Sequence, residues 1–270
     1  MRQNKAARPY TTEEVIQMER ALFRTENLIF GYDHDKKALD GISFSAGPGE
    51  SVGIIGANGA GKSTLLKLTV GLIGGFSGVM EVCGIQMTGE KENLRRIREK
   101  CGYVFQDSEN QLFMNTVEED VAFAPHNYGL EPGEVRERTE SALRQVNIPH
   151  LGKKSVHALS GGEKKLAAIA TILSMTPEIL LMDEPSAALD PKNRRNLIRV
   201  INELPQLKLI ASHDLDFIWD TCSRTILIDG GRIVRDGPTE EIMTDGPLLD
   251  AHGLELPLSL SGRHRRDSVI

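Results

Sequence analysis

Apolar and polar positions recur along this chain with two periods, which predict strands and helices in alternation. Short apolar runs bounded by turn formers predict buried strands, and apolar residues at helical spacing predict helices that cover them. The first unit is a strand at 50–56, a glycine-rich turn and a helix from residue 62, which begins a βαβ unit. The alternation resumes later, with a helix at about 161–175, a strand at 178–185, a helix at about 191–203, a strand at 207–214 and two strands over 224–237 joined at Gly230–Gly231.

The beginning of the chain has a different pattern. Residues 1–20 form a polar extension with a predicted short helix around 12–20. Two strand-like runs, 27–32 and 42–47, then flank a segment rich in turn formers at 33–41. We predict that this segment is a loop.

The middle of the chain, between about 107 and 160, is predicted to be helical and inserted. Thr116 and Glu119 have the T-x-x-E spacing of a capping box ahead of a helix. A second helix is predicted over 131–148, with Pro132 near its start.

Residues 241–270 are predicted to form a C-terminal tail. The tail carries a small basic cluster, which we interpret as part of a solvated, disordered segment; binding to anionic lipid or to a partner is the alternative. The cluster consists of Arg263, His264, Arg265 and Arg266.

Composition excludes some classes of function. The chain has 270 residues, of which 40% are hydrophobic and 26% charged, as in an ordinary globular protein with one large or two small domains. The formal net charge of -6 argues against binding nucleic acid through overall positive charge, so no nucleic-acid partner is expected.

Cysteine usage and hydropathy bear on the cellular setting. The three cysteines, Cys83, Cys101 and Cys222, form no C-x-x-C pair, which argues against a disulfide framework and a cysteine-rich zinc site and favours reduced cytosolic thiols. No apolar run approaches the roughly 18 residues of a membrane span, and the N-terminus lacks the apolar core of a signal peptide. If the protein works at a membrane, a partner must hold it there.

The glycine-rich turn fits the phosphate-binding pattern G-x-x-x-x-G-K-[ST]. The strand before it and the helix after it argue against a chance match. The N–H groups of residues 59–62 can surround a phosphate, Lys62 reaches the β- and γ-phosphates, and the Ser63 hydroxyl can ligand Mg²⁺. The predicted nucleotide-binding residues of this turn are Gly56, Ala57, Asn58, Gly59, Ala60, Gly61, Lys62, Ser63 and Thr64.

Two carboxylates, Asp183 and Glu184, end the buried strand at 178–185. Ligands of open α/β sheets bind at the carboxyl edge of the strands. There, Asp183 suits Mg²⁺ bound through water, and Glu184 suits the polarising of an attacking water. A helix-capping acidic pair is the alternative.

The next strand ends in ASHD, which brings His213 to the same edge, where its ring could contact a γ-phosphate. A histidine after a strand is usually structural, but here several signals meet at one edge. The other histidines have no ligand spacing and are interpreted as structural or surface residues; they are His34, His126, His150, His157, His252 and His264.

Two further residues are candidates only in this context. Gln106 follows a strand-like segment and could touch Mg²⁺ or water, and Tyr32 could stack on adenine. Taken alone, each is more often structural: an aromatic residue at a strand end usually belongs to the core.

The segment LSGGEKK, residues 159–165, combines a helix start with bare backbone. Ser160 and Glu163 have capping-box spacing, and Gly161 and Gly162 leave the N–H groups of the first turn approachable. A helix start of this kind is an anion site.

Together these motifs resemble the ATP-binding-cassette (ABC) ATPases over about Leu22 to Gly237. The resemblance rests on Tyr32, GANGAGKST, FQ at 105–106, LSGGEKK, LLMDEP, SAALD at 186–190 and His213. It implies an α/β P-loop NTPase fold with a RecA-like core, an antiparallel β subdomain and a helical subdomain inserted at about 107–165, within a domain of residues 21–240. It also implies ATP with Mg²⁺, held by Ser63, Gln106 and Asp183, and catalytic roles for Glu184, His213 and Gln106.

In this family the segment that corresponds to LSGGEKK is called the signature segment, and the glycine-rich turn is called the P-loop. The signature segment of one subunit faces the P-loop of a second subunit. Ser160, Gly161 and Gly162 would then hold the γ-phosphate bound to the partner's Lys62, with Glu163 capping the same helix. ATP would join a head-to-tail dimer, with Asp190 at the interface linking the two sites.

A narrower resemblance, in residues 104–130, is to the ATPases of energy-coupling-factor (ECF) transporters. ENQLF followed by TVEEDVAF is typical of that subfamily, and other segments look similar to its cobalt/nickel type. The resemblance implies a homodimer, an integral membrane coupling subunit seated in a groove, a substrate-binding membrane subunit, and a peripheral place on the cytoplasmic face of the cell membrane. Ser186 and Ala188 depart from the commoner Thr and Gly without removing a catalytic group.

Two alternatives stay open at this point. The first is an ABC ATPase of a non-transport machine such as iron–sulfur cluster assembly, from which only ENQLF…TVEEDVAF separates this chain. The second is a P-loop kinase or GTPase, but those lack an LSGG-type signature, and no N-K-x-D motif occurs here.

Overall fold

The computed structural model describes residues 21–33 and 36–264. The short helix predicted around residues 12–20 lies outside the described residues. So do residues 265–270 of the predicted tail, which include two members of its basic cluster.

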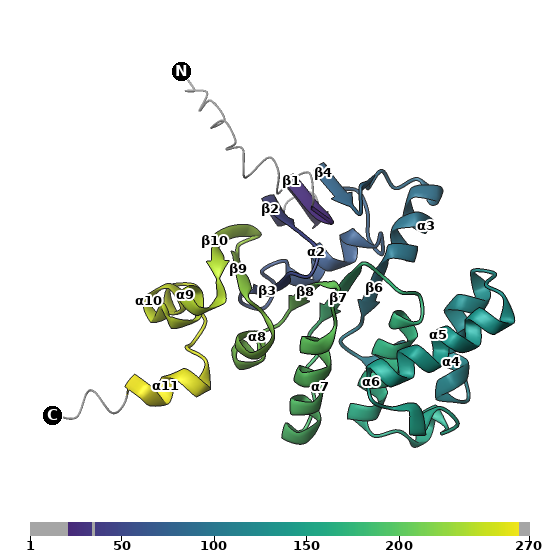
Figure 1. Ribbon diagram of the computed structural model, residues 1–270. Helices are drawn as coiled ribbons and strands as arrows, with labels where there is room; N and C mark the ends of the chain where they lie inside the picture. Colours follow the sequence, from purple (N-terminus) through teal and green to yellow (C-terminus); the bar gives the residue numbers. More distant parts are fainter. Residues whose placement is uncertain (1–20, 34–35, 265–270) are drawn as a thin grey trace.

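The strands of the described chain form two sheets (Figure 1). The larger sheet has the order β10-β9-β3-β8-β7-β6, and the smaller one the order β2-β1-β4-β5. Five neighbouring strands of the larger sheet run parallel, while its edge strand β10 is antiparallel to β9. The strands are β1 (Phe23–Asp33), β2 (Lys36–Ala46), β3 (Ser51–Ile55), β4 (Ser77–Val82), β5 (Ile85–Gln86), β6 (Cys101–Val104), β7 (Ile179–Asp183), β8 (Leu207–Ala211), β9 (Arg224–Asp229) and β10 (Arg232–Pro238).

Helices connect and cover these strands. The α-helices are α2 (Lys62–Thr69), α3 (Lys91–Lys100), α4 (Val117–Asn127), α5 (Pro132–Gln145), α6 (Gly161–Leu173), α7 (Pro191–Glu203), α8 (Leu215–Thr221), α9 (Thr239–Thr244), α10 (Gly246–Ala251) and α11 (Leu258–His264). Three 3₁₀ turns join them, namely η1 (Ser108–Asn110), η2 (Pro149–Leu151) and η3 (Val156–Ala158).

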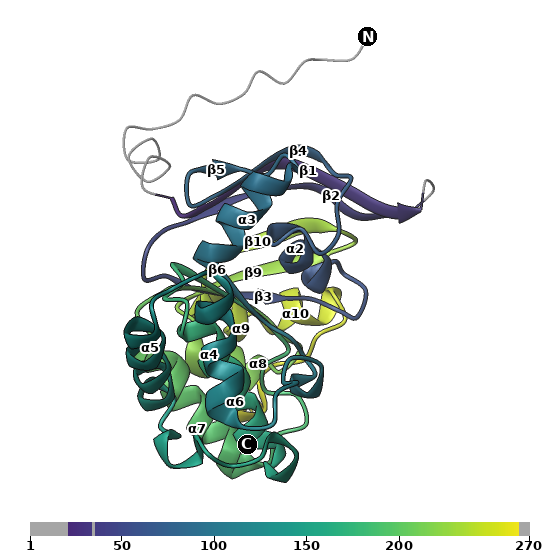
Figure 2. The same cartoon turned by 90° about the vertical axis from the view of Figure 1, so that its right-hand side faces the viewer.

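The larger sheet is buried on both faces, which makes the molecule layered (Figure 2). In β7, Ile179 and Leu181 belong to the core shared with α2 and the smaller sheet, whereas Leu180 and Met182 belong to the core shared with α6, α7 and α8. Burial on both faces explains why this strand has an uninterrupted apolar sequence, the pattern from which it was predicted.

The inserted helical segment is present as predicted. The Thr116 side chain accepts a hydrogen bond from the Glu119 N–H, and the Glu119 carboxylate accepts one from the Thr116 N–H, so the capping box ahead of α4 is confirmed. Pro132 lies at the start of α5, where a backbone N–H would have no hydrogen-bond partner within the helix, so its absence costs nothing. Helices α4 and α5 pack against each other and against α6, sharing a core with the larger sheet.

The predicted loop at 33–41 is wrong at every described position, since Asp33 ends β1 and the remaining described residues are in β2. Residues 36–41 belong to β2, which pairs with β1 through Phe30 opposite Leu39 and Gly31 opposite Lys37. Irregular register on either side of Gly31 lets the polar and glycine residues fit into the ladder. The turn formers that suggested a loop therefore lie in a bulged antiparallel pair.

The hairpin over 224–237 is confirmed. Asp229 pairs with Arg232, and the two glycines between them have φ of 52° and 77°, values that suit glycine in a tight turn.

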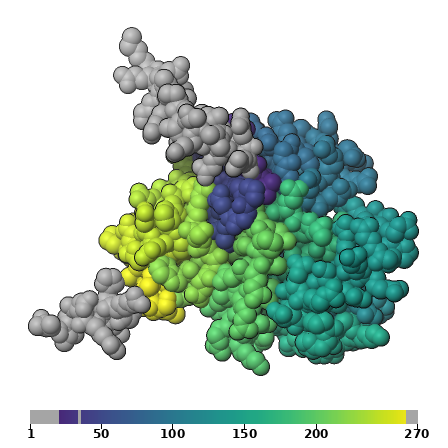
Figure 3. All heavy atoms as spheres, viewed as in Figure 1, coloured from purple at the N-terminus to yellow at the C-terminus, as the bar shows by residue number. Residues whose placement is uncertain are grey.

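The tail region differs from the expectation. Residues 239–264 contain α9, α10 and α11, and Ile242, Met243 and Leu249 are buried in the core beneath α8. The Asp216 carboxylate accepts hydrogen bonds from the first N–H groups of α11. Figure 3 shows this segment (yellow) lying against the body of the molecule. The expectation of a disordered tail therefore fails for residues 258–264.

Within the described part of the chain, no helix is both long and apolar enough to cross a membrane.

Gly102 gives a test of this packing. A Cβ at Gly102 in β6 would lie 1.7 Å from Cγ2 of Ile172 in α6. We expect Gly102→Ala to lower the free energy of unfolding by about 1–3 kcal/mol through overpacking, measured by urea unfolding. Adding Ile172→Ala should lower the free energy of unfolding less in the Gly102→Ala variant than in the wild type, because it removes the clash. Strictly additive losses of unfolding free energy would contradict the close approach of Gly102 and Ile172.

Candidate functional site

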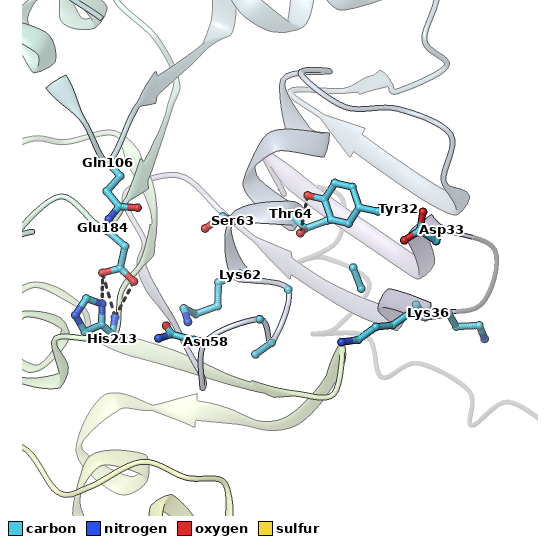
Figure 4. A pocket seen from close by; sticks show the side chains of 15 residues that line it. Tyr32, Asp33, Lys36, Asn58, Lys62, Ser63, Thr64, Gln106, Glu184 and His213 are labelled. Carbon is cyan, nitrogen blue, oxygen red and sulfur yellow. Dashed lines mark hydrogen bonds and ion pairs between the residues drawn. The ribbon is translucent and has the colours of Figure 1, made fainter. Parts of the chain in front are cut away.

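A cavity of about 550 Å³ opens between the smaller sheet, the start of α2 and the carboxyl ends of the parallel strands (Figure 4). It brings together most of the residues predicted for nucleotide binding and hydrolysis. Those that line it are Tyr32, Asn58, Gly59, Ala60, Gly61, Lys62, Ser63, Thr64, Gln106, Glu184 and His213; Asp33, Lys36, Lys37 and Ala38 line it as well. Gly56, Ala57 and Asp183 lie beside it, whereas Ser160, Gly161, Gly162, Glu163 and Asp190 are not among the lining residues.

The turn between β3 and α2 depends on glycine at two positions. Gly56 has φ of 150°, and a Cβ there would lie 2.1 Å from the Ile228 carbonyl oxygen. Gly61 has φ of 108°, and its Cβ would meet the Ala38 carbonyl oxygen at 2.5 Å. The turn thus runs against the backbone of β2 and β9. Of the four N–H groups predicted to surround a phosphate, that of Ala60 already donates to Ala57 O at 3.1 Å.

Lys62 is buried, and its Nζ donates to the carbonyl oxygens of Gly56 at 2.7 Å and of Ala57 at 3.2 Å. Its own turn therefore holds the ammonium at the floor of the cavity. Burial lowers the pKa of Lys62, while the charges of Glu184 and Asp183 act in the opposite direction.

Asp183 is joined to the turn by a short chain of hydroxyl contacts. The Ser63 hydroxyl donates to Asp183 Oδ1 at 2.7 Å, and the Tyr103 hydroxyl donates to Oδ2 at 3.0 Å. Burial first, and then the nearby Asp183 charge, raise the pKa of Tyr103 well above its ordinary value, so this hydroxyl keeps its proton. Two predicted metal ligands, Ser63 and Asp183, are in direct contact, with Gln106 lining the same cavity. Hydroxyl, carboxylate and amide oxygens are the hard donors that suit Mg²⁺.

Glu184 directly follows β7, and three polar groups of Ser212 and His213 contact its carboxylate. Its carboxylate accepts from the Ser212 hydroxyl at 2.9 Å and from the His213 N–H at 3.1 Å, and it contacts His213 Nδ1 at 2.8 Å (Figure 4). The residue has φ of 47°, an uncommon backbone conformation for a residue other than glycine. Strain of this kind persists where the surroundings fix it, and it concentrates at functional sites. His213 thus lies at the predicted edge with its ring 63% exposed and turned toward Glu184.

Tyr32 lies at the other end of the cavity and is 61% exposed. Its ring packs edge-on against Phe30, and its hydroxyl lies 3.1 Å from Thr64 Oγ1 (Figure 4). Contrary to the usual behaviour of an aromatic residue at a strand end, the ring is not part of the core. Its exposed surface is available to a flat ligand.

The signature segment forms the predicted helix start. Ser160 caps α6 by accepting from the Glu163 N–H, and the Glu163 carboxylate accepts from the Ser160 N–H. That bond first, together with Lys154, lowers the pKa of Glu163. Gly161 has no atom within 4 Å of a Cβ position. This helix start is thus capped and bare, but it belongs to no cavity that contains Lys62 in the same chain.

Asp190 is linked to the signature segment through Asn193. Its carboxylate caps α7 by accepting from the N–H groups of Lys192 and Asn193, and it accepts from the Asn193 side chain at 2.6 Å. The Asn193 side chain packs on Gly162, where a Cβ would lie 2.2 Å from Asn193 Cγ. The loop at Asp190 and the signature helix are therefore packed together.

Gln106 is held through its backbone by α6. Lys165, a buried residue of α6, donates from Nζ to the carbonyl oxygens of Phe105 at 3.1 Å and of Gln106 at 2.8 Å. Burial lowers the pKa of Lys165 to about 8. Gln111 adds a second link, since its side chain accepts from the Phe105 N–H and donates to Ala168 O at 2.7 Å.

A second cavity, of about 250 Å³, lies between α3, β6, α4 and α6, and we call it the groove. In Figure 3, α3 (blue) borders the helical segment (teal) at this side of the molecule. Phe113 is 64% exposed and packs edge-on against Phe123. The groove is lined by Arg98, Glu99, Cys101, Gly102, Tyr103, Gln111, Phe113, Asp120, Phe123, Ala124, Tyr128, Thr171, Ile172, Met175 and Pro177.

Four residues that contact the site were not singled out from the sequence: Tyr103, Ser212, Lys165 and Gln111. Two of them had a local signal. Tyr103 lies near the end of the buried strand β6, shortly before Gln106, and Ser212 lies between β8 and His213; both positions are close to the same sheet edge. Lys165 lies in LSGGEKK and Gln111 in ENQLF, but neither motif indicated these contacts, because the contacts join segments about 60 residues apart in the chain.

Comparison with known proteins agrees with this geometry. The ABC transporter family model matches residues 39–187, more than half of the chain. A putative ABC transporter ATP-binding protein of Gloeobacter violaceus is 48% identical over 237 residues, which cover 87% of this chain and 96% of that protein. The energy-coupling factor transporter ATP-binding protein EcfA of Methanoculleus marisnigri is 40% identical over 240 residues, covering 87% and 86%.

The fold is also that of solved cassettes. The structure of cbiO1 from Clostridium perfringens, described as part of the ABC transporter complex cbiONQ, matches with a TM-score of 0.80 and 33% identity over 92% of this chain and 99% of that one. The predicted α/β P-loop fold is thereby confirmed. The chain belongs to the ABC transporter family, as an ATP-hydrolysing, ATP-binding subunit that resembles those of energy-coupling-factor transporters.

Proposed function

We propose that this chain is the motor subunit of an ECF-type importer, which couples ATP binding and hydrolysis in a homodimer to uptake of cobalt or nickel ions. The observation that carries the proposal is the separation of two halves of a site. The P-loop cavity and the capped start of α6 each have the form of a phosphate-binding surface, yet they are not part of one cavity in a single chain. Two copies placed head to tail would bring each start of α6 to the other's cavity.

In such a dimer, the signature of one copy would meet the γ-phosphate held by the other. Ser160 and the N–H groups of Gly161 and Gly162 would supply donors at the positive end of α6, where Gly161 is uncovered and Gly162 is packed against Asn193. Asp190, packed behind Gly162 through Asn193, would reach the interface with them. ATP would then hold the dimer together, and its hydrolysis would release it.

The residue after β7 would catalyse hydrolysis. Glu184, oriented by Ser212 and by the backbone of His213, would accept a proton from the attacking water as a general base. The His213 ring, exposed into the cavity, would face the γ-phosphate. Gln106 would position the water or a ligand of the metal, and Tyr32 would cover the adenine.

Ser63, Asp183 and Gln106 form the donor set that would hold Mg²⁺. Bound there, the ion supplies positive charge that offsets the charge developing on the phosphates. The chain itself positions the ligands, since Ser63 at the start of α2 and Asp183 at the end of β7 are already in contact.

The groove is the proposed seat of the membrane coupling subunit, which would hold this chain at the cytoplasmic face of the membrane. Gln111 both lines the groove and binds the backbone next to Gln106. A displacement at the nucleotide would reach the groove through this residue and Lys165. Selection of the ion would fall to another membrane subunit; the support for cobalt or nickel is the similarity to cbiO1, a component of cbiONQ.

The base is tested by Glu184→Gln, which keeps the shape and loses the proton acceptor. We expect ATP binding at wild-type affinity and turnover slowed by about a hundredfold or more, measured by steady-state phosphate release. The matched control is Glu203→Gln, at the end of α7 and away from the cavity, which should leave turnover unchanged. Wild-type turnover of the Glu184 variant would exclude it as the base.

The shared site is tested by Ser160→Arg in the Glu184→Gln background, where ATP is not consumed. The added bulk and charge should abolish the ATP-dependent dimer in sedimentation velocity, while ATP binding by the monomer persists. Lys153→Arg, on the nearby surface, serves as control. An ATP-dependent dimer of the Ser160 variant would contradict the cross-subunit arrangement.

The cargo and the groove are tested by ion uptake into vesicles that contain this chain with its membrane subunits. We expect ATP-dependent uptake of Co²⁺ or Ni²⁺, and loss of uptake with Phe113→Asp although the isolated variant still hydrolyses ATP. Absence of metal uptake by an ATP-hydrolysing complex would refute the cargo. Normal uptake by the Phe113 variant would refute the groove as the docking site of the membrane coupling subunit.

A further inference from the structure

One buried hydroxyl lies between the groove and the nucleotide cavity. Tyr103, on β6, lines the groove and is only 9% exposed. Its ring packs against Phe105, with 4.7 Å between the ring centroids, and its hydroxyl donates to Asp183 Oδ2 at 3.0 Å. A residue that lines the groove thus contacts a residue of the proposed Mg²⁺ site.

The two oxygens of Asp183 are held from opposite sides. Oδ1 accepts from Ser63, which starts α2, and Oδ2 accepts from Tyr103, which comes from the neighbouring strand. With both contacts made, rotation of the carboxylate would break one hydrogen bond or the other. Asp183 is buried, so a lost partner would not readily be replaced by solvent.

We propose that Tyr103 is a positioning residue for Mg²⁺: its hydroxyl fixes the Asp183 carboxylate in the orientation that presents Oδ1 to Ser63. The inference rests on the Mg²⁺ site proposed above. Partners of metal ligands set the ligand's orientation, and their loss typically weakens metal binding about 10–100-fold.

The other polar links of the groove go elsewhere, which makes the role of Tyr103 separable. Gln111 binds the backbone of Phe105 and α6. Arg98 donates to the carbonyl oxygens of Val70 and Gly71 at the end of α2. Any partner seated in the groove would therefore lie next to the residue that orients Asp183, and that contact is distinct from those to the backbone near Gln106.

The test is Tyr103→Phe, which keeps the ring and removes the hydroxyl. ATP binding would be titrated first in EDTA and then with increasing Mg²⁺, in the isolated protein. The variant should bind ATP like the wild type in EDTA, because the Tyr103 hydroxyl donates to Asp183 and not to the glycine-rich turn. It should need about tenfold more Mg²⁺ for half-maximal enhancement of ATP binding. Tyr103→Met, which also lacks the hydroxyl, should show the same shift.

The control is Thr139→Val, which removes a buried hydroxyl that donates to Val135 O within α5; Thr139 lines neither of the two cavities. It should leave the Mg²⁺ titration unchanged, even if both this variant and Tyr103→Phe lower the unfolding temperature. A wild-type Mg²⁺ titration for both Tyr103 variants would overturn the positioning role and leave the proposed function standing. A wild-type protein whose ATP binding ignores Mg²⁺ would overturn the metal site and the role together.

Discussion

The register of three parallel strands is the constraint on which the site depends. Ala211 at the end of β8 pairs with Asp183 at the end of β7 and with Ile54 of β3. The residues that follow these paired positions must therefore lie at the same edge of the sheet. The glycine-rich turn follows β3, Glu184 follows β7, and Ser212 with His213 follows β8. A shift of one residue in either pairing would send these side chains to the wrong face, because successive residues of a strand point to opposite sides.

The same register explains how much could be predicted from the sequence. Strands buried on both faces have continuous apolar sequences, so β3, β7 and β8 and their polar ends were predictable together. The capping boxes at Thr116 and Ser160 and the glycine hairpin were predictable because each depends on residues a few positions apart. The residues 36–41 of β2 were not, since their strand conformation is set by pairing with β1 rather than by their own turn-forming sequence. The C-terminal helices were missed because they are short and obtain their order from burial against α8.

Within the site, the missed residues are those that orient others. Ser212 and Tyr103 contribute hydroxyl groups to carboxylates that the sequence did identify, and Lys165 binds backbone carbonyls. The sequence motifs around these residues do not indicate their partners, and only the fold brings them together. The sequence therefore indicates the groups that would act on ATP, while the structure adds the groups that hold them. Glu184 illustrates the difference: its identity was predictable, but its left-handed backbone and its three donors were not.

The contact of Asn193 with Gly162 bears on how two copies would come together. Because Asp190, Asn193 and the start of α6 are already fastened to one another, the surface offered to a second copy is shaped before that copy arrives. Association then loses little conformational freedom in this region, and more of the attraction to the nucleotide appears as net affinity. Such a preorganised face also favours rapid, repeated opening and reclosing, since nothing on it must refold at each cycle.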